Sequence, residues 1–258
     1  MNEEVVVMEP KKYQFLSGGA LKIIAIIIML IDHIGASVIA RLLNGGYFSD
    51  LDYTRFKNYY EILRTIGRIA FPIFCFLLVE GFLHTRSPKK YIVRLGVFGL
   101  ISEWPFDMAF FQQWTYKHQN VFFTLFIGLI CIWGMDSLSK NKFFSDKKIR
   151  FKDFLLVMIQ VIIAFAGMAC ALYLNTDYNM YGVLVIIVLY IFRKERGFSA
   201  LAGYFVMFKI DTMCFPGFLL TQFYNGKRGI KLKYLFYLFY PAHLLILWYI
   251  GTVLLASK

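Results

Sequence analysis

An adjacent aspartate and histidine, Asp32-His33, stand inside a long apolar run from about Ala20 to Leu43. Placing an ionisable group inside a bilayer costs about 2.5–3.5 kcal/mol, and such groups usually serve a function. Histidine changes its charge near neutral pH, so a buried neutral imidazole is suited to act as a general base. Neighbours on a helix point about 100° apart, so Asp32 need not contact His33, and a carboxylate from a nearby helix, Glu103 or Asp107, can orient it instead.

Other polar residues interrupt the later apolar runs. If each run is a helix that crosses the membrane, most of these residues lie at one depth, from the midplane to the outer third. Charges that served only to fix helix packing would have no reason to gather there. Glu103 and Asp107 are four residues apart and therefore share a helix face. The set comprises Arg68, Glu80, Glu103, Asp107 and His243, together with Gln119 and Asn120 at the start of a run.

Several of these residues have an equally good structural interpretation. A buried ion pair with Asp107 or Glu103 explains Arg68 as well as a role in substrate binding does. A hydrogen bond to a neighbouring helix explains His243 as well as chemistry does. A local pair is the favoured interpretation of Glu80 with His84, and an ordinary surface position that of His118.

The composition indicates the kind of protein that holds these residues. Of 258 residues, 59% are hydrophobic and 17% are charged, and the mean hydropathy is +0.59. A soluble domain averages about 25% charged residues, so the composition excludes a soluble enzyme, a disordered tail and a secreted disulfide scaffold. The four cysteines lie in apolar stretches without a CxxC motif, which is typical of buried packing residues and indicates neither a disulfide nor a metal site.

The apolar runs and the charges together predict a membrane topology. A helix needs about 20 apolar residues to cross a bilayer. We expect an all-α polytopic bundle of about nine spans, with the N-terminus inside, the C-terminus outside, no signal peptide and a polar external loop over 42–60. With this orientation, twenty of the 28 Lys and Arg residues lie inside, as the positive-inside rule requires, so the net charge of +12 indicates topology and not nucleic-acid binding. The expected spans are 20–42, 62–84, 91–111, 119–137, 152–174, 181–193, 198–212, 214–224 and 233–256, with Ser17 as the cap of the first.

At this point a family resemblance becomes visible. Short blocks in order along nearly the whole chain resemble the TraX family of membrane proteins. They are Met29-Leu30-Ile31-Asp32-His33-Ile34-Gly35, Arg64-x-x-Gly67-Arg68, Glu80-Gly81-Phe82-x-His84, Glu103-x-Pro105-Phe106-Asp107, Gln119-Asn120-Val121-Phe122, Asn225-Gly226-Lys227-Arg228-Gly229 and Tyr240-Pro241-x-His243.

The resemblance implies one TraX-like transmembrane acyltransferase domain over 1–258. The family is named for a protein that N-acetylates pilin. It is distantly similar to membrane acyltransferases, which move acyl groups from cytoplasmic coenzyme A to acceptors at the outer face, with a histidine of an early helix as the base. The resemblance implies that His33 takes that role in this chain. The implied sites are catalytic (Asp32, His33, Glu103, Asp107), oxyanion- or substrate-binding (Arg68, Gln119, Asn120, His243) and coenzyme A-binding (Arg86, Lys89, Lys90, Asn225, Lys227, Arg228).

The expected function is therefore transfer of acetyl from acetyl-CoA to an amine or hydroxyl near the outer side of a bacterial inner membrane. The expected partners are membrane lipid, coenzyme A and an acceptor. The identity of the acceptor is open, and it can be a protein N-terminus, a glycan or a small molecule. We expect no metal and no nucleic acid. The positive-inside rule is an alternative explanation of the basic residues assigned to coenzyme A. A proton-coupled transporter that uses the same carboxylates and histidines is the second hypothesis, and a non-catalytic component of an envelope assembly is the third.

Overall fold

A computed structural model describes residues 12–46, 48–115, 117–145, 150–230 and 233–256. The architecture is all-helical, and in the described part of the chain β-type pairing is confined to two isolated bridges. The elements are α1 (Gly18–His33), the π-helix η1 (Ile34–Ile39), α2 (Ala40–Asn44), α3 (Asp50–Gly67), α4 (Ala70–Leu83), α5 (Pro88–Phe111), α6 (Val121–Ser139), α7 (Lys142–Ser145), α8 (Arg150–Tyr173), α9 (Asn179–Ile191), α10 (Arg196–Met207), the 3₁₀-helix η2 (Thr212–Cys214), α11 (Phe215–Gln222) and α12 (Lys233–Ala256).

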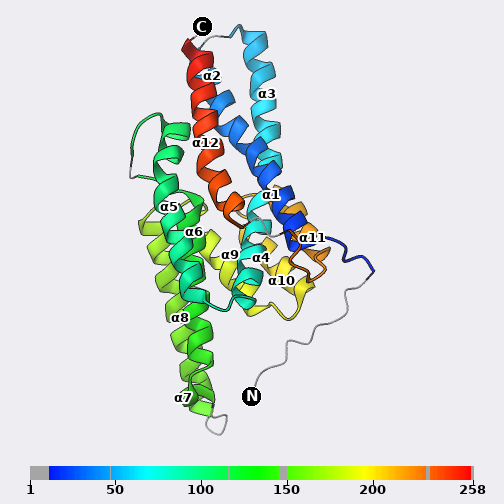
Figure 1. The fold of residues 1–258 in the computed structure, drawn as a ribbon, viewed down its shortest axis with the longest axis vertical. Coiled ribbons are helices and arrows are strands. Elements are labelled where there is room, and N and C mark those ends of the chain that lie inside the picture. The colour runs from blue at the N-terminus through cyan, green and yellow to red at the C-terminus, as the bar shows by residue number, and fades with distance from the viewer. Residues whose placement is uncertain (1–11, 47, 116, 146–149, 231–232, 257–258) are drawn as a thin grey trace.

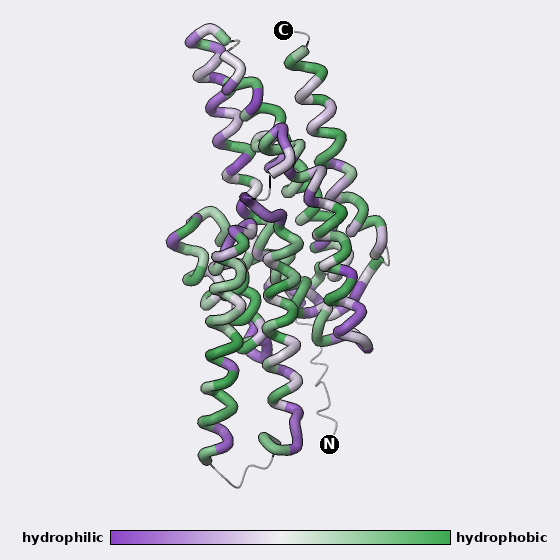
Figure 2. Tube along the Cα trace, turned by 90° about the vertical axis from the view of Figure 1, so that its left-hand side faces the viewer, coloured by the Kyte–Doolittle hydropathy of each residue, from purple (hydrophilic) through white to green (hydrophobic). Residues whose placement is uncertain are grey.

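The helices form an elongated bundle. At one end α2, α3 and α12 rise together and carry the C-terminus, whereas α6 and α8 run to the opposite end, beside α7 (Figure 1). In the middle, α9 packs against α4, α6, α8 and α10, and α5 packs against α6 and α12. Hydrophobic residues cover most of the tube, and hydrophilic residues gather at its two ends and at mid-height (Figure 2).

Five helical runs are long and apolar enough to cross a membrane. They are Gly18–Asn44, Asp50–Leu83, Val121–Ser139, Phe151–Tyr173 and Tyr234–Ala256, and Asn179–Ile191 is a shorter apolar helix. Each of the nine expected spans coincides with a helical segment. The eight residues of α11 extend only about 12 Å, less than half of a hydrocarbon core. The number of nine crossings and their orientation stay predictions.

The expectation of a loop throughout 42–60 is wrong, whereas its placement on the external side stays a prediction. Only a short connection separates α2 from α3, and α3 begins at Asp50. The side chain of Ser49 accepts a hydrogen bond from the backbone N–H of Asp52, and Asp50 and Asp52 place negative charge at the positive helix end. A polar sequence with these capping signals forms a helix that continues beyond the apolar run.

Two expectations about single residues have opposite outcomes. Ser17 caps α1 as predicted, because its hydroxyl accepts a hydrogen bond from the N–H of Ala20 at 3.2 Å. Cys170 is exposed, whereas the other three cysteines are buried. All four are free thiols, and Cys170 lies on α8, whose outer face is apolar and exposed as expected for contact with lipid.

The segment 224–229 holds the start of α1 in place. The N–H groups of Gly18 and Gly19 donate to the carbonyls of Lys227 and Arg228 at 2.8 and 2.9 Å. These are N–H groups that a helix start leaves without intrahelical partners. Gly229 has a φ of +67°, and a Cβ there would lie 2.3 Å from the hydroxyl oxygen of Ser17. The helix that carries His33 is therefore fixed by a turn 209 residues later in the chain.

Candidate functional site

A cavity of about 500 Å³ lies beside His33. Its wall combines residues of the first helical run with α3, α5 and two connections, 118–119 and 175–179. The residues are Asp32, His33, Ala36, Tyr60, Arg64, Arg68, Phe106, Phe110, Phe111, His118, Gln119, Asn175, Thr176, Asp177, Tyr178 and Asn179. Of the predicted site residues, Asp32, His33, Arg68 and Gln119 share this cavity. Small-molecule sites commonly have this form, a largely apolar concavity with a few convergent polar groups.

His33 is paired with His243 of α12. Nδ1 of His33 lies 2.7 Å from Nε2 of His243, and the two rings are stacked with an interplanar angle of 6°. Nδ1 of His243 lies 2.7 Å from the carbonyl oxygen of Phe239. A carbonyl only accepts, so His243 must donate through Nδ1, and its neutral ring then offers Nε2 as an acceptor.

This chain of hydrogen bonds assigns the tautomer of His33. If His243 accepts at Nε2, His33 donates through Nδ1, and the lone pair of its neutral ring is on Nε2. Nε2 of His33 lies 3.9 Å from Oδ2 of Asp32, which lines the cavity. The His33 side chain is 12% exposed. The arrangement therefore offers a proton acceptor whose other nitrogen is already engaged, which is what a general base needs.

Asp32 is the carboxylate next to this base. Its Oδ2 accepts a hydrogen bond from Nη1 of Arg64 at 2.6 Å, and its side chain is 16% exposed. The other oxygen, Oδ1, packs on Gly67, where a Cβ would lie 2.0 Å away. A residue with any side chain at 67 would displace Asp32, so the glycine permits the contact between α1 and α3.

Arg68 is held by two groups from the later part of the chain. Its Nε donates to Oδ2 of Asp211 at 2.8 Å, and its guanidinium lies beside the phenol of Tyr178 in the cavity wall. The alternative of a buried pair with Asp107 or Glu103 is therefore wrong, because α10 and η2 place Asp211 beside α4. Since Arg68 lines the cavity, it brings a positive charge to the space next to His33.

Glu103 and Asp107 make their contacts away from the His33 ring. Oε2 of Glu103 accepts from the side-chain amide of Asn120 at 2.5 Å, and Oδ2 of Asp107 accepts from the N–H of Thr115 at 2.8 Å. We therefore correct the expectation that one of them orients His33, because the nearest carboxylate to its ring nitrogen is Asp32. The helix α5 uses its two carboxylates to fix the connection to α6.

Asn120 has a structural position. It is buried, its Oδ1 accepts from the N–H of Phe122 at 3.0 Å, and its amide nitrogen donates to the Gly99 carbonyl at 2.8 Å and to Glu103. It thus caps α6 and ties it to α5. The oxyanion-binding role expected for Asn120 has no support in this geometry, because its side-chain donor is engaged by these two acceptors.

Two connections form a rim around the cavity. Gln119 and Thr176 form a bridge, the N–H of Asp177 donates to the Gln119 carbonyl at 2.9 Å, and the side chain of Asn175 lies 2.7 Å from Nδ1 of His118. His118 is exposed, as expected for a surface histidine, and it also lines the cavity. The rim joins the connections before α6 and before α9 into one rigid unit.

Asp177 adds a carboxylate to this rim. It is exposed to the cavity, and its Oδ1 accepts from the N–H of Tyr178 at 3.1 Å. Loss of hydration and the nearby negative charge of Asp32 raise the pKa of Asp177 to about 6, although Arg64 and Arg68 act in the opposite direction. A carboxyl group that titrates near pH 6 therefore faces the cavity.

The residues assigned to coenzyme A lie in two exposed groups. Arg86, Lys89 and Lys90 surround the start of α5, and Lys227 and Arg228 belong to the turn that holds α1. Asn225 has a structural part in that turn, because its Oδ1 accepts from the N–H of Lys227 at 2.9 Å and its amide donates to the carbonyl of Phe15 at 3.2 Å.

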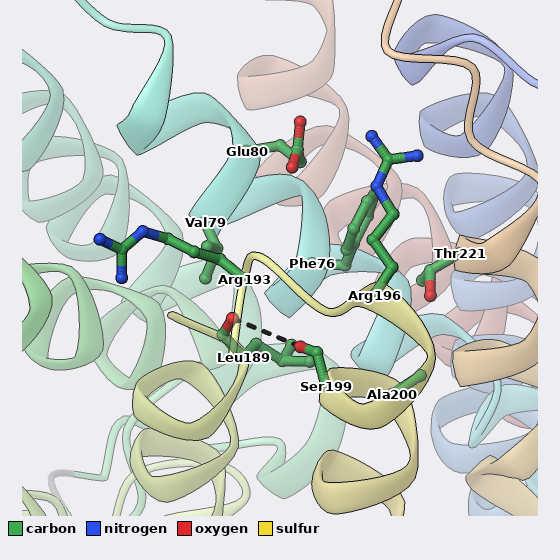
Figure 3. A pocket seen from close by; sticks show the side chains of 9 residues that line it. All are labelled: Phe76, Val79, Glu80, Leu189, Arg193, Arg196, Ser199, Ala200 and Thr221. Atoms are coloured by element: carbon green, nitrogen blue, oxygen red, sulfur yellow. Dashed lines mark hydrogen bonds between the residues drawn. The ribbon is translucent and has the colours of Figure 1, made fainter. Parts of the chain in front are cut away.

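A second pocket lies apart from the large cavity, between α4, α9, α10 and α11. Figure 3 shows Glu80 and Arg196 at its rim, the guanidinium of Arg193 directed away from it, and the hydroxyl of Ser199 bonded to the Leu189 carbonyl. Its volume of about 20 Å³ admits one water-sized group. Nδ1 of His84 lies 3.8 Å from Oε2 of Glu80 near this pocket, which confirms the predicted local pair.

The sequence analysis missed three residues that line the large cavity, Arg64, Asp177 and Tyr178. It also missed Asp211, which forms an ion pair with Arg68 of the cavity wall. The spacing offered a signal for Arg64, which stands four residues before Arg68 and so shares its helix face. The polar stretch 175–179 between two apolar runs marked a connection but carried no motif. Within the described residues, no cluster of three or more His, Cys, Asp or Glu side chains is arranged to hold a metal ion.

Comparisons with known proteins agree with the resemblance of the motifs. The family model described as TraX protein matches residues 17–251, which includes every residue of the cavity wall. A curated relative, "Probable fimbrial assembly protein FimC, serogroup H1" of Dichelobacter nodosus, is 32% identical over 266 residues, covering 90% of this chain and 94% of the relative. No solved structure gives a significant match to the chain.

Proposed function

This chain belongs to the TraX family, and we propose that it is an integral-membrane acyltransferase in which His33 is the general base. The observation that carries the proposal is the hydrogen-bonded series from the Phe239 carbonyl through His243 to His33. It leaves Nε2 of His33 as the basic atom, next to Asp32 on the wall of a 500 Å³ cavity. A neutral histidine with a fixed tautomer is the form that removes a proton from an amine or a hydroxyl.

The proposed reaction transfers acetyl from acetyl-CoA to an acceptor. The acyl donor supplies an activated thioester. Nε2 of His33 accepts the proton of the acceptor amine or hydroxyl as the new bond to the carbonyl carbon forms. His33 then returns that proton to the departing sulfur as the carbon–sulfur bond breaks, so the base is regenerated. While His33 carries the proton, the nearby carboxylate of Asp32 stabilises the imidazolium.

The positive side chains of the cavity have a role in the same reaction. Negative charge develops on the carbonyl oxygen during acyl transfer, and fixed donors stabilise it. Arg68 and Arg64 both line the cavity, and each is fixed by a carboxylate, Asp211 and Asp32 respectively. Because their carboxylate partners hold them in place, the two guanidinium groups need little reorganisation when the charge forms.

The donor and the acceptor are proposed to approach from different sides. The rim of the cavity belongs to connections that the charge pattern places outside, so we assign the cavity to the acceptor. The two groups of exposed basic residues, Arg86 with Lys89 and Lys90 and Lys227 with Arg228, are predicted to lie inside and suit the phosphates of coenzyme A. The relative's name makes a fimbrial subunit an acceptor to test.

The test is an acetyl-transfer assay with the detergent-purified protein and radiolabelled acetyl-CoA. The acceptor panel contains a peptide with a free N-terminus, a fimbrial subunit, a glycan and a small amine. We expect His33→Ala to lower turnover by about 10²- to 10⁴-fold, the usual contribution of a general base. His84→Ala is the matched control, because His84 is 59% exposed and pairs with Glu80 away from the cavity.

Two results would reject the proposal. One is acetyl transfer by His33→Ala at the rate of the unaltered protein. The other is flux of a solute across proteoliposomes that depends on His33 and consumes no acetyl-CoA, which is the result expected for a proton-coupled transporter.

A further inference from the structure

Tyr178 has an unusual backbone conformation next to the cavity. Its φ is +60°, in the left-handed region that bulky residues rarely adopt, and Asn175 and Asn179 beside it also have positive φ values. Such conformations cost about 1–3 kcal/mol each and persist where the surrounding structure requires them. Three within five residues indicate that the connection between α8 and α9 is built to hold something in a defined place.

Tyr178 lines the cavity, and its left-handed conformation places the phenol against Phe71. Its ring is stacked on the ring of Phe71, with centroids 3.6 Å apart and an interplanar angle of 5°. Its hydroxyl faces the guanidinium of Arg68, which stands three residues before Phe71 and lines the same cavity. Gly182, one turn into α9, allows this approach, because a Cβ there would lie 3.0 Å from Phe71 and 2.9 Å from Tyr178.

The connection that carries Tyr178 is itself anchored. The hydroxyl of Thr124 on α6 bonds the hydroxyl of Thr176 at 3.0 Å, and it also donates to the carbonyl of Asp177. Both threonines are buried. The backbone of Asp177 is fixed to Gln119 as described above. The phenol therefore reaches Arg68 from a support that does not depend on Arg68.

Asp211 holds the same guanidinium from another support. Its Oδ1 accepts from the N–H of Met213 at 2.8 Å and caps η2, which leaves Oδ2 for Nε of Arg68. Behind it α11 lies close to α4, because a Cβ on Gly217 would lie 2.3 Å from the carbonyl oxygen of Ile69. Two rigid connections thus meet at one arginine of the cavity wall.

We propose that Tyr178 is a positioning residue that, together with Asp211, sets the guanidinium of Arg68 towards the carbonyl oxygen of the acyl group during transfer. This inference rests on the proposed function. A guanidinium has five N–H donors, so the contacts to Asp211 and Tyr178 can fix its plane without engaging all of them, and Arg68 lines the cavity. A shift of about 1 Å in such a group can cost about 100-fold in rate.

The experiment measures kcat and KM for acetyl transfer in Tyr178→Phe, which keeps the ring and loses the hydroxyl. We expect kcat to fall by about 10- to 100-fold, with KM for the acceptor changed less than about twofold and the melting temperature nearly unchanged. Tyr173→Phe is the matched control, since Tyr173 lies five residues earlier and is 89% exposed.

A double-mutant cycle with Arg68→Lys tests whether Tyr178 acts through Arg68. In the Arg68→Lys background, Tyr178→Phe should lower kcat by less than about twofold, because the group it positions is already gone. If Tyr178→Phe does not fold, Asp211→Asn replaces it in the cycle. We expect Asp211→Asn to show the same loss of kcat and the same non-additivity with Arg68→Lys.

The outcomes separate the two proposals. If the unaltered protein transfers no acetyl group, the proposed function fails. If the unaltered protein is active and Tyr178→Phe has the same kcat, or if its effect adds fully to that of Arg68→Lys, the positioning role is overturned and the proposed function stands.

Discussion

Gly67 should tolerate no side chain, because α1 and α3 meet there through Asp32. A Cβ at this position would lie 2.0 Å from Oδ1, 2.3 Å from Cγ and 2.4 Å from Cβ of Asp32. An ordinary contact needs about 3.5 Å, so the aspartate must move by more than about 1 Å. That movement breaks the 2.6 Å hydrogen bond to Arg64 and the approach to His33.

The magnitude follows from three contributions. Loss of a buried hydrogen bond between charged groups costs about 1.5–3 kcal/mol, and overpacking costs about 1–3 kcal/mol. Replacing a helical glycine by alanine returns about 0.5–1 kcal/mol. We therefore expect Gly67→Ala to lower the free energy of unfolding by about 2–5 kcal/mol. For a chain of this size, about 1 kcal/mol corresponds to about 2–4 °C, so the melting temperature should fall by at least about 4 °C.

The assay is thermal unfolding of the purified protein in one detergent. Gly197→Ala is the matched control, because Gly197 lies in α10 and a Cβ there meets nothing within 4 Å. It should be neutral or stabilise by up to about 1 kcal/mol. A melting temperature of Gly67→Ala within about 2 °C of Gly197→Ala would refute the reasoning.

Three further predictions concern the base, the rim and the turn at the start of α1. Replacing His243 by Phe keeps an aromatic ring and removes the acceptor that fixes the tautomer of the base, so kcat for acetyl transfer should fall at least about tenfold. The folded-state pKa of Asp177, about 6, is above the ordinary value of 3.8, so the unfolded chain loses this proton first and stability should fall as the pH rises from about 4 to about 6. Asp177→Asn should remove that slope in melting temperatures measured from pH 4 to pH 8. Gly229→Ala should destabilise more than Gly226→Ala, by at least about 1 kcal/mol in denaturation experiments, because both have positive φ but only a Cβ at 229 meets Ser17.

Each of these predictions has a contrary result. Full activity of His243→Phe would show that the tautomer of the base is fixed by another group. An unchanged pH slope in Asp177→Asn would assign the titration to a different carboxyl group. Equal stability of the two glycine variants would mean that the crowding at position 229 relaxes without cost.

The sequence was sufficient for the parts of the site that depend on local spacing. Apolar runs predicted the helices, and the cost of intramembrane charge singled out His33 and Arg68, both of which line the cavity. The cap at Ser17 and the pair of Glu80 with His84 followed from i to i+3 and i to i+4 geometry.

The partners of those residues were beyond the sequence. His33 and His243 are 210 residues apart, and their contact depends on how α12 crosses α1 and η1. From the sequence, the carboxylates on α5 were equally good partners for an ion pair with Arg68. The packing of α11 against α4 places Asp211 beside Arg68 instead. The left-handed conformation of Tyr178 has no local signal, because tyrosine does not favour it and only the tertiary contacts impose it.

The π-helix η1 has a consequence for the length of the first span. A π turn closes hydrogen bonds from residue i to i+5, as between the Gly35 carbonyl and the Ala40 N–H, and so holds one residue more than an α turn. It acts as a one-residue insertion absorbed at a single place, directly after α1 ends at His33. The apolar periodicities before and after it are therefore out of step by one residue, or about 100°. Deleting one residue from Ile34–Ile39 would convert the π turn into an α turn. Both flanking contacts can survive this deletion, namely that of His33 with His243 and that of Arg41 with the Trp248 carbonyl.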